Sequence, residues 1–229
     1  MFKFKIPLMY NVKEIFSTLQ GEGTHAGRVA IFCRFTGCNL WSGREEDRSK
    51  AICQFCDTDF VGTDGSGGGK FQNAGDLAQN ILNEWLTMNR SVNHRYVIFT
   101  GGEPLLQLDD DLIKALKEHH FEIGIETNGT ITPPQGIDWI CVSPKDGSEL
   151  VLLQGSEIKY IVPQNDLLFS KENIIQKLKR FEQMNFKHFY LQAMDSPSKD
   201  RHLKLAIELC KERPIWRLST QQHKFLNLP

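Results

Sequence analysis

Short apolar segments alternate along the chain with segments in which apolar residues recur at helical spacing. Leu77, Ile81, Leu82 and Trp85 recur every three or four residues and predict a helix over 74–88. The same alternation predicts further helices near 109–119, 170–184 and 198–212, and strands at 28–35, 96–100, 121–126, 138–142, 157–162, 187–192 and 215–219. About seven strands with fewer helices are typical of an α/β fold, here an incomplete parallel β/α barrel.

Most of the predicted strands end in glycine or polar residues. The strand over 96–100 ends at Thr100 and runs into Gly101, Gly102 and Glu103. Barrel enzymes carry their chemistry at the carboxyl ends of the strands. Consecutive glycines expose backbone groups to a ligand, and a glutamate can accept a hydrogen bond from an ammonium group, although an ordinary turn explains the same residues.

Arg34 lies inside the apolar strand predicted over 28–35, where a charge is costly unless it is paired. A ligand carboxylate and an internal salt bridge explain it equally well. Alternation places Cys33 on the opposite face of the strand. Elsewhere, the glycines in 14–27 form either a turn or a close approach to a flat ligand, and the glycine-rich segment 62–69 predicts a solvated loop.

The composition narrows the class of protein. The chain has 229 residues, 40% of them hydrophobic, so we expect residues 1–229 to form a single domain with one well-buried core. The 27 basic and 28 acidic side chains nearly cancel, so direct nucleic-acid binding is not indicated and a small substrate is expected. Clustered cysteines suit a reducing cytoplasm. The chain lacks the long apolar run of a signal peptide or a membrane span, so we expect a cytoplasmic protein without a membrane partner.

Three cysteines follow the strand over 28–35 in one segment. Cys38, Cys53 and Cys56 have the spacing C-x14-C-x2-C, which predicts a metal site because the paired cysteines share one turn and the third can return from the other side. An iron–sulfur cluster held by three cysteines would leave one iron open to a ligand. A zinc site with Cys33 as the fourth ligand, or cysteines without a ligand, remain alternatives.

With Phe55 before the last of these cysteines, and with the Gly-Gly-Glu-Pro sequence at 101–104, the chain resembles the radical S-adenosylmethionine (AdoMet) enzymes. It is most similar to the family of 7-carboxy-7-deazaguanine synthases. The residues that carry this second resemblance are Leu19 to Gly23, Arg34 to Cys38, Cys56 to Thr58, Glu126 to Gly129, Ser143 to Lys145 and His223 to Pro229. The insertion over 39–52 departs from the commonest radical AdoMet spacing, C-x3-C-x2-C, and indicates a subtype.

The resemblance implies a partial radical AdoMet barrel in which loop 38–58 holds a 4Fe–4S cluster on Cys38, Cys53 and Cys56, beside a magnesium ion (Mg2+) on Thr58. It also implies an AdoMet site, formed by Phe55, Cys56, Asp57, Gly102, Glu103, Ser143, Pro144, Lys145, Gln192, Ala193, Met194 and Asp195. A pterin substrate, 6-carboxy-5,6,7,8-tetrahydropterin, would contact Leu19, Gln20, Gly21, Glu22, Arg34, Thr100 and, in the tail 220–229, His223 and the carboxylate of Pro229.

The resemblance further implies a lyase reaction in deazapurine (queuosine-type) biosynthesis, a tRNA modification pathway. The six-membered ring of the pterin would contract to 7-carboxy-7-deazaguanine and ammonia would leave, with electrons from a flavodoxin-like donor and the chain as a homodimer. Two other functions stay open: a four-cysteine zinc-binding module and a radical AdoMet activase that places a glycyl radical on a partner protein. Arg34 and the tail favour a small anionic substrate over a protein.

Overall fold

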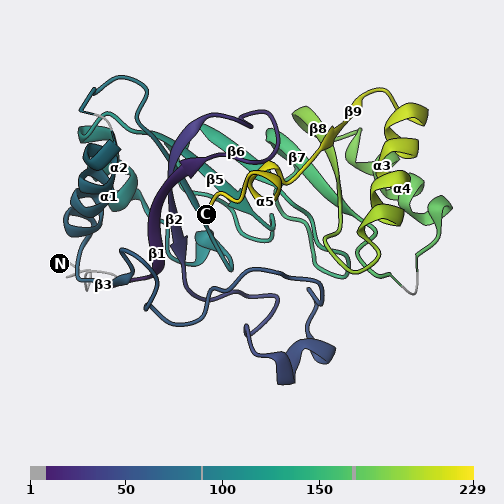
Figure 1. The fold of residues 1–229 in the computed structure, drawn as a ribbon, viewed down its shortest axis with the longest axis horizontal. Helices are drawn as coiled ribbons and strands as arrows, with labels where there is room; N and C mark the ends of the chain where they lie inside the picture. Colours follow the sequence, from purple (N-terminus) through teal and green to yellow (C-terminus); the bar gives the residue numbers. More distant parts are fainter. Residues whose placement is uncertain (1–8, 89, 167–168) are drawn as a thin grey trace, which may run out of the picture.

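The structure is a computed structural model that describes residues 9–88, 90–166 and 169–229. Within these residues the chain forms one nine-stranded sheet in the order β3-β1-β2-β4-β5-β6-β7-β8-β9 (Figure 1). The strands are β1 (Tyr10–Leu19), β2 (Val29–Phe35), β3 (Gly69–Phe71), β4 (Tyr96–Gly101), β5 (Glu122–Thr127), β6 (Trp139–Val142), β7 (Gln154–Val162), β8 (Asn185–Ala193) and β9 (Trp216–Ser219).

From β2 to β9 each strand pairs in parallel with its neighbour in the sheet, whereas β1 pairs in antiparallel fashion with β2 and β3. This mostly parallel α/β sheet confirms the predicted incomplete barrel. Parallel neighbours need crossover connections. Helical segments lie in the connections that lead to β4, β5, β8 and β9, whereas loops join β5 to β6 and β6 to β7.

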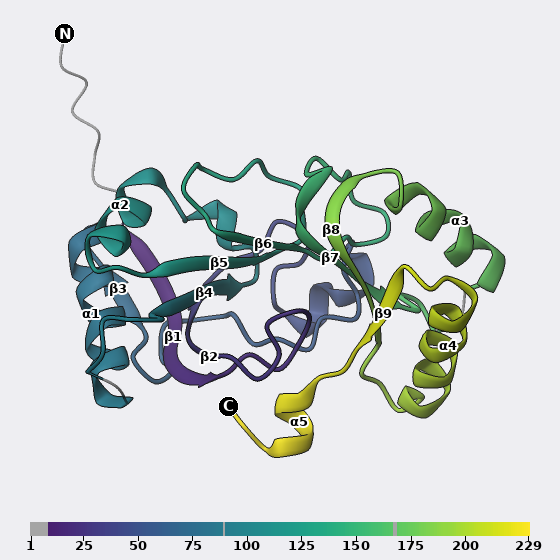
Figure 2. The same ribbon diagram turned by 90° about the horizontal axis from the view of Figure 1, so that it is seen from above.

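Helices cover the sheet near its two ends. The helices are α1 (Ala74–Met88), α2 (Asp110–Glu118), α3 (Lys171–Phe181), α4 (Lys199–Glu212) and α5 (Gln222–Leu226), with short 3-10 helices η1 (Glu45–Lys50) and η2 (Pro104–Leu106). Figures 1 and 2 show α1 and α2 together on one side and α3 and α4 on the other. None of the helices in the described part of the chain is long and apolar enough to cross a membrane.

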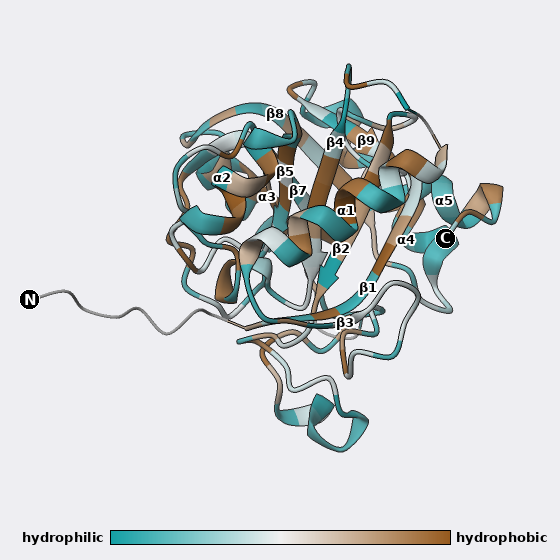
Figure 3. Cartoon of the chain, turned by 90° about the vertical axis from the view of Figure 1, so that its left-hand side faces the viewer, coloured by the Kyte–Doolittle hydropathy of each residue, from teal (hydrophilic) through white to brown (hydrophobic). Residues whose placement is uncertain are grey.

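Apolar side chains of these helices form two cores against the sheet. Leu77, Ile81 and Trp85 of α1 pack with Leu112 and Leu116 of α2 against β2, β4 and β5, and a second core joins α3 and α4 to β7, β8 and β9. In Figure 3 the hydrophobic strands β4 and β5 lie behind α1 and α2. The helical spacing read from the sequence therefore marks the faces that the helices bury.

The side chains at the helix starts explain where two of the predicted helices begin. The Asp109 carboxylate accepts a hydrogen bond from the N–H of Leu112 at 3.0 Å. The Ser170 hydroxyl accepts one from the N–H of Asn173 at 3.1 Å. Each bond pairs an N–H group that the first turn of a helix leaves without an intrahelical partner.

The predicted count of about seven strands was too low, because β1 and β3 were missed. Strand β1 carries polar residues at most alternate positions, and the three residues of β3 are too few to show a period. The prediction of a solvated loop over 62–69 was wrong in part: Gly69 lies in β3, the N–H of Gly65 donates to the carbonyl of Lys13 at 3.0 Å, and that of Ile15 donates to the carbonyl of Ser66 at 2.8 Å. This segment pairs with β1 along much of its length.

The two faces of β2 point to different surroundings, as the alternation predicted. Cys33 is fully buried in the core beneath α1 and α2, whereas Ala30 packs with Tyr96 and Ile98 in a separate cluster. Among the other cysteines, Cys141 is buried, and Cys210 of α4 is half-buried and packs against the second core.

Candidate functional site

One cavity of about 490 Å³ gathers most of the predicted site residues. Loop 38–58, the carboxyl ends of β4, β5, β6 and β8, and the tail 220–229 all contribute to its wall. The predicted residues that line it are Leu19, Gln20, Gly21, Glu22, Arg34, Cys38, Cys53, Phe55, Cys56, Asp57, Thr58, Thr100, Gly102, Ser143, Lys145, Gln192, Ala193, Met194, Asp195, His223 and Pro229.

The three cysteines of loop 38–58 face this cavity, and their surroundings differ. A hydrogen bond from the Cys53 thiol, with a further one from the N–H of Thr58, lowers the pKa of Cys56 although burial opposes the shift. Burial raises the pKa of Cys38, whose sulfur accepts a hydrogen bond from the N–H of Leu40 at 3.4 Å. The Cys56 side therefore favours a thiolate, which is the form that binds a metal.

The position of Cys33 bears on the zinc alternative. Cys38, Cys53 and Cys56 line the cavity, whereas Cys33, the fourth ligand of that alternative, faces the core beneath α1 and α2. Cys33 therefore does not lie with the other three cysteines, as a four-cysteine zinc site requires. Three cysteines are the ligand set that leaves one iron of a 4Fe–4S cluster open to a further ligand.

Gly102 lies where the chain passes closest to the cysteine loop. A Cβ atom at this position would come within 2.1 Å of the carbonyl oxygen of Gly37 and 2.6 Å of Cys38 Cβ. The N–H of Glu103 donates to the same Gly37 carbonyl at 2.9 Å. Only glycine fits this contact, which joins the end of β4 to the start of the cysteine loop.

Of the predicted AdoMet residues, which all belong to the described part of the chain, Glu103 and Pro144 stand outside the cavity lining. Glu103 is fully buried, and its carboxylate accepts hydrogen bonds from Thr127 Oγ1 at 2.7 Å, from the N–H of Asn128 at 2.8 Å and from the N–H of Leu105 at 3.0 Å. Three internal donors thus hold the Glu103 carboxylate, and a contact between Glu103 and an ammonium group of a ligand stays a prediction.

A buried charge cluster forms the polar part of the cavity wall. Lys159 of β7 is 4% exposed and forms ion pairs with Glu22 and, at 3.0 Å, with Glu126. Gln20 Nε2 donates to Glu126 Oε1 and Gln192 Nε2 donates to Glu22 Oε1, both at 3.1 Å. Each carboxylate therefore has a fixed orientation, set by Lys159 and by one amide.

The two carboxylates of this cluster differ in acidity. Burial acts to raise the pKa of Glu22, but the charge and hydrogen bond of Lys159 outweigh it, so the pKa is lowered. For Glu126 burial prevails over the attraction of Lys159, and the pKa is raised. Lys159 itself keeps its proton, because burial is outweighed by the negative charges around it and its pKa is raised well above the usual range. The cluster thus holds one lysine between two acceptors of unequal basicity.

Arg34 lines the cavity and forms the internal salt bridge that was one of its two interpretations, while its contact with a ligand carboxylate stays a prediction. Its Nε atom donates to Glu14 Oε1 at 2.7 Å, and the two side chains are 18% and 29% exposed. Because Arg34 and Glu14 both line the cavity, a carboxylate of a bound ligand would compete with Glu14 for the guanidinium group.

The tail 220–229 closes one side of the cavity through polar contacts with distant segments. Lys224 of α5 pairs with Asp57 at 2.7 Å and with Asp195 at 2.5 Å. The N–H of Gln222 donates to the carbonyl of Gly21 at 3.0 Å, and Thr18 Oγ1 donates to the carbonyl oxygen of Pro229 at 3.3 Å. The tail therefore packs against the rest of the chain, although the side chain of Phe225 is 75% exposed.

Sequence reasoning missed three charged residues of the site. Glu126 was noted only as part of a motif, and Lys159 and Lys224 were not singled out. Lys159 carried a usable signal, since it lies in an apolar strand just as Arg34 does, and the same argument about an unpaired buried charge applies to it. Lys224 carried none, because lysines are common on exposed helices.

A mostly parallel partial barrel, with three cysteines in a loop after β2 and a polar cavity at the strand ends, defines a radical AdoMet enzyme. The chain is 56% identical to a 7-carboxy-7-deazaguanine synthase of Bradyrhizobium diazoefficiens, over 96% of this chain and 100% of that protein. It is 53% identical to the 7-carboxy-7-deazaguanine synthase of Burkholderia multivorans, over 97% of this chain and 100% of that protein. The chain belongs to the 7-carboxy-7-deazaguanine synthase family.

The fold supports the same assignment. The crystal structure of QueE from Escherichia coli matches with a TM-score of 0.67 and 26% sequence identity, over 94% of this chain and 95% of that chain. No protein-family model matches the chain.

Proposed function

We propose that the chain catalyses the ring contraction of 6-carboxy-5,6,7,8-tetrahydropterin to 7-carboxy-7-deazaguanine with loss of ammonia. The observation that carries the proposal is the single cavity in which three cysteines and a buried cluster of two carboxylates and one lysine face each other. Because substrate and product differ only by ammonia, the overall reaction needs no net oxidant. A site that generates and then recovers a radical suits such a reaction.

Cys38, Cys53 and Cys56 would hold the 4Fe–4S cluster, and Gly102, Ser143, Lys145 and the segment 192–195 would hold AdoMet beside it. When bound, the cluster and AdoMet supply a carbon radical that abstracts hydrogen from the substrate. Phe55, Asp57 and the backbone around Gly102 would orient AdoMet. Glu103 would act through its bonds to Thr127 and Asn128, which fix the adjoining wall of the cavity.

The pterin would lie against the charge cluster formed by Gln20, Glu22, Glu126 and Lys159. Its pyrimidine ring carries a row of N–H donors, which match the two carboxylate acceptors of this wall. The substrate carboxylate would reach Arg34, and the backbone of Leu19 and Gly21, with Thr100, His223 and the carboxylate of Pro229, would line the rest of its site. These contacts hold the reacting carbon in one place and exclude water, which a radical reaction requires.

We also propose that Thr58 binds a magnesium ion together with the substrate. The threonine lines the cavity next to Cys56 and Asp57, and Mg2+ prefers oxygen ligands and often binds through one or two protein groups and a substrate. Titrating the reconstituted enzyme with Mg2+ should raise kcat/KM for the pterin, and Thr58→Val should abolish that increase.

A flavodoxin-like electron donor and a homodimer complete the proposal, with the product feeding a queuosine-type tRNA modification pathway. The apolar side chains of Phe225 and Leu226 are 75% and 61% exposed, which supports burial of this part of the surface against a second copy of the chain. Sedimentation of the purified protein should give the mass of a dimer.

The decisive experiment is anaerobic purification and reconstitution followed by incubation with AdoMet, a reductant and the carboxytetrahydropterin. We expect about four iron atoms per chain, acid-labile sulfide and formation of the deazaguanine product. A colourless protein with one zinc ion per chain would overturn the cluster. An intact cluster that cleaves AdoMet but never consumes the pterin would overturn the substrate and favour another radical AdoMet activity, such as an activase.

Arg34→Ala should raise KM for the pterin by about 10- to 100-fold, because a charge-assisted hydrogen bond to the substrate carboxylate is lost. Iron content should be unchanged. Glu14→Gln serves as the matched variant, since it removes the salt bridge and keeps the guanidinium group free for the substrate. If both variants weaken binding equally, Arg34 acts only through its bond to Glu14. Steady-state kinetics and iron analysis provide the measurements.

Removing Pro229 should raise KM for the pterin by about tenfold, because a residue that lines the cavity and accepts a hydrogen bond from Thr18 is lost. The cluster and AdoMet binding should persist, because Lys224 still joins the tail to Asp57 and Asp195. Uncoupled AdoMet cleavage in the absence of pterin reports on that part of the site. An unchanged KM for the pterin would contradict a role for Pro229.

A further inference from the structure

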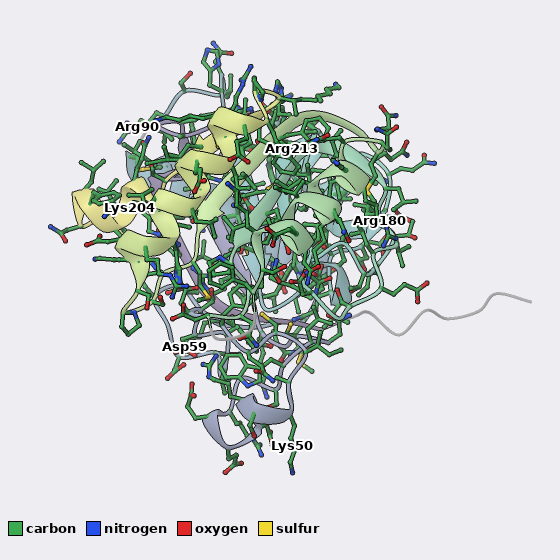
Figure 4. The ribbon with its side chains drawn as sticks, turned by 90° about the vertical axis from the view of Figure 1, so that its right-hand side faces the viewer. Lys50, Asp59, Arg90, Arg180, Lys204 and Arg213 are labelled. Atoms are coloured by element: carbon green, nitrogen blue, oxygen red, sulfur yellow. The ribbon has the colours of Figure 1, made fainter. Side chains whose placement is uncertain are left out.

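The insertion over 39–52, which separates the first cysteine of the loop from the other two, has a defined conformation. It projects from the sheet, and Lys50 lies at the far end of η1, away from the strands (Figures 1 and 4). At its base the N–H groups of Ile52 and Cys53 both donate to the carbonyl of Leu40, at 3.1 and 3.3 Å. The insertion therefore returns to its starting point just before Cys53.

One side chain of the insertion reaches back to the turn between Cys53 and Cys56. Arg48 Nη1 donates to the carbonyl oxygens of Gln54 and Cys56, both at 3.0 Å. These two carbonyls flank Phe55, so a single guanidinium nitrogen ties together both ends of the backbone that carries the C-x2-C pair. The Arg48 side chain is 27% exposed, which limits competition from water.

The remaining contacts of Arg48 fix its own position. Its Nε and Nη2 atoms pair with the Glu45 carboxylate at 2.7 and 2.5 Å. The guanidinium lies 4.0 Å from the ring centre of Trp41, a residue that is 7% exposed and packs edge-on against Phe60. A planar guanidinium can make a forked ion pair, two carbonyl bonds and a stacked contact at once, whereas a lysine ammonium cannot.

The charge of Arg48 also bears on the cysteines. Its positive charge attracts the thiolate forms of both Cys53 and Cys56. A fixed cation near a cluster stabilises the reduced, more negative state, and charge and hydrogen bonding around a cluster set its reduction potential.

We propose that Arg48 is a positioning residue for the iron–sulfur cluster: it holds the Gln54 to Cys56 backbone in the conformation that presents two of the thiolates, and its charge makes the cluster easier to reduce. The insertion therefore stabilises the conformation of the loop that carries the cysteines. This inference rests on the cluster assigned in the proposed function.

The test compares Arg48→Gln and Arg48→Lys with Arg44→Gln in the reconstituted holoenzyme. Arg44 belongs to the same insertion, has a side chain that is 71% exposed and pairs with Glu46 at only 3.8 Å, so it is a matched control for the loss of one charge. Two readouts are independent of turnover: the rate of iron release to a chelator under anaerobic conditions, and the midpoint potential of the cluster from a spectroscopic redox titration.

For Arg48→Gln we expect iron release to accelerate by at least about tenfold, the equivalent of about 1.4 kcal/mol, and the midpoint potential to become more negative. For Arg48→Lys we expect faster iron release with a smaller change in the midpoint potential. The lysine keeps the positive charge but cannot make all the hydrogen bonds of the guanidinium group. Arg44→Gln should match the wild type in both measurements.

The inference would be overturned if the Arg48→Gln variant gave the same rate of iron release and the same midpoint potential as the Arg44→Gln variant. If Arg48→Gln fails to fold, Arg48→Lys decides: iron release as slow as in the wild type would overturn the positioning role. A wild-type protein that holds no cluster after reconstitution would overturn the proposed function itself, and the two failures are thus distinguishable.

Discussion

The Cys56→Ala variant is expected to lose the cluster, and its activity should fall by more than about a thousandfold. The proposed site has no other source of the radical. Cys56 is the cysteine whose pKa is lowered, through the Cys53 thiol and the N–H of Thr58. Iron and sulfide analysis and the visible absorption of the reconstituted protein are the measurements.

The control for this experiment is Cys210→Ala, which removes a half-buried cysteine from α4. It should keep about four iron atoms per chain and full activity. A Cys56→Ala protein that retains the same iron content and turnover would contradict the assignment of this thiolate, and equal loss in both variants would point to a general effect on folding.

Lys159→Met is expected to lower kcat/KM for the pterin by about 100-fold and the free energy of unfolding by about 3–5 kcal/mol, because it leaves two buried carboxylates without their cation. Without Lys159, burial raises the pKa of Glu22, which the lysine keeps lowered in the wild type. If these carboxylates must be ionised to accept from the pterin, the acidic limb of the kcat/KM profile moves to higher pH.

The sign of the pH effect on stability also follows from Glu22. Its lowered pKa contributes stability above the ordinary value of 4.5, and this contribution is lost as pH falls through the folded pKa. Glu126, with its raised pKa, acts in the opposite direction. In the Lys159→Met variant burial should raise the pKa of both carboxyl groups, so protonating them at acidic pH should stabilise the folded variant.

Lys204→Met is the matched control for Lys159→Met. Lys204 lies on the exposed face of α4 (Figure 4), so its loss should leave the pH profile and the unfolding free energy within about 0.5 kcal/mol of the wild type. An acidic limb that stays in place in Lys159→Met would contradict the role of Lys159 in setting the charge state of the carboxylates. Denaturant unfolding and steady-state kinetics at several pH values test both variants.

The sequence predicts the parallel part of the fold well, because burial on both faces leaves clear apolar runs. Strand β4 is such a run, and helix α1 is recognisable because its apolar residues recur at helical spacing on one side. Strand β1 was missed since its stability comes from pairing with β2 and β3, which a local pattern does not record. The conformation of the insertion was equally unpredictable, because Arg48 and Trp41 fix it through contacts rather than through periodicity.

For the site, local motifs identified the residues that a ligand would touch but not how they are held. Cys56 and Gly102 follow from motifs of a few residues, and both line the cavity. The burial of Glu103 could not be foreseen, because its partners Thr127 and Asn128 belong to the next strand of the sheet. The pairing of Lys159 with Glu22 joins residues 137 positions apart, a contact that only the fold creates.

The order of the sheet has a consequence for how the chain assembles during translation. From β4 onwards each strand pairs with the strand that leaves the ribosome next, so this part of the sheet can grow strand by strand as synthesis proceeds. The cavity, in contrast, joins residues of β1 and the tail, such as Thr18 and Pro229, whose separation in sequence is 211 residues. The nascent chain can thus acquire most of its hydrogen-bonded framework before it has any place for a substrate.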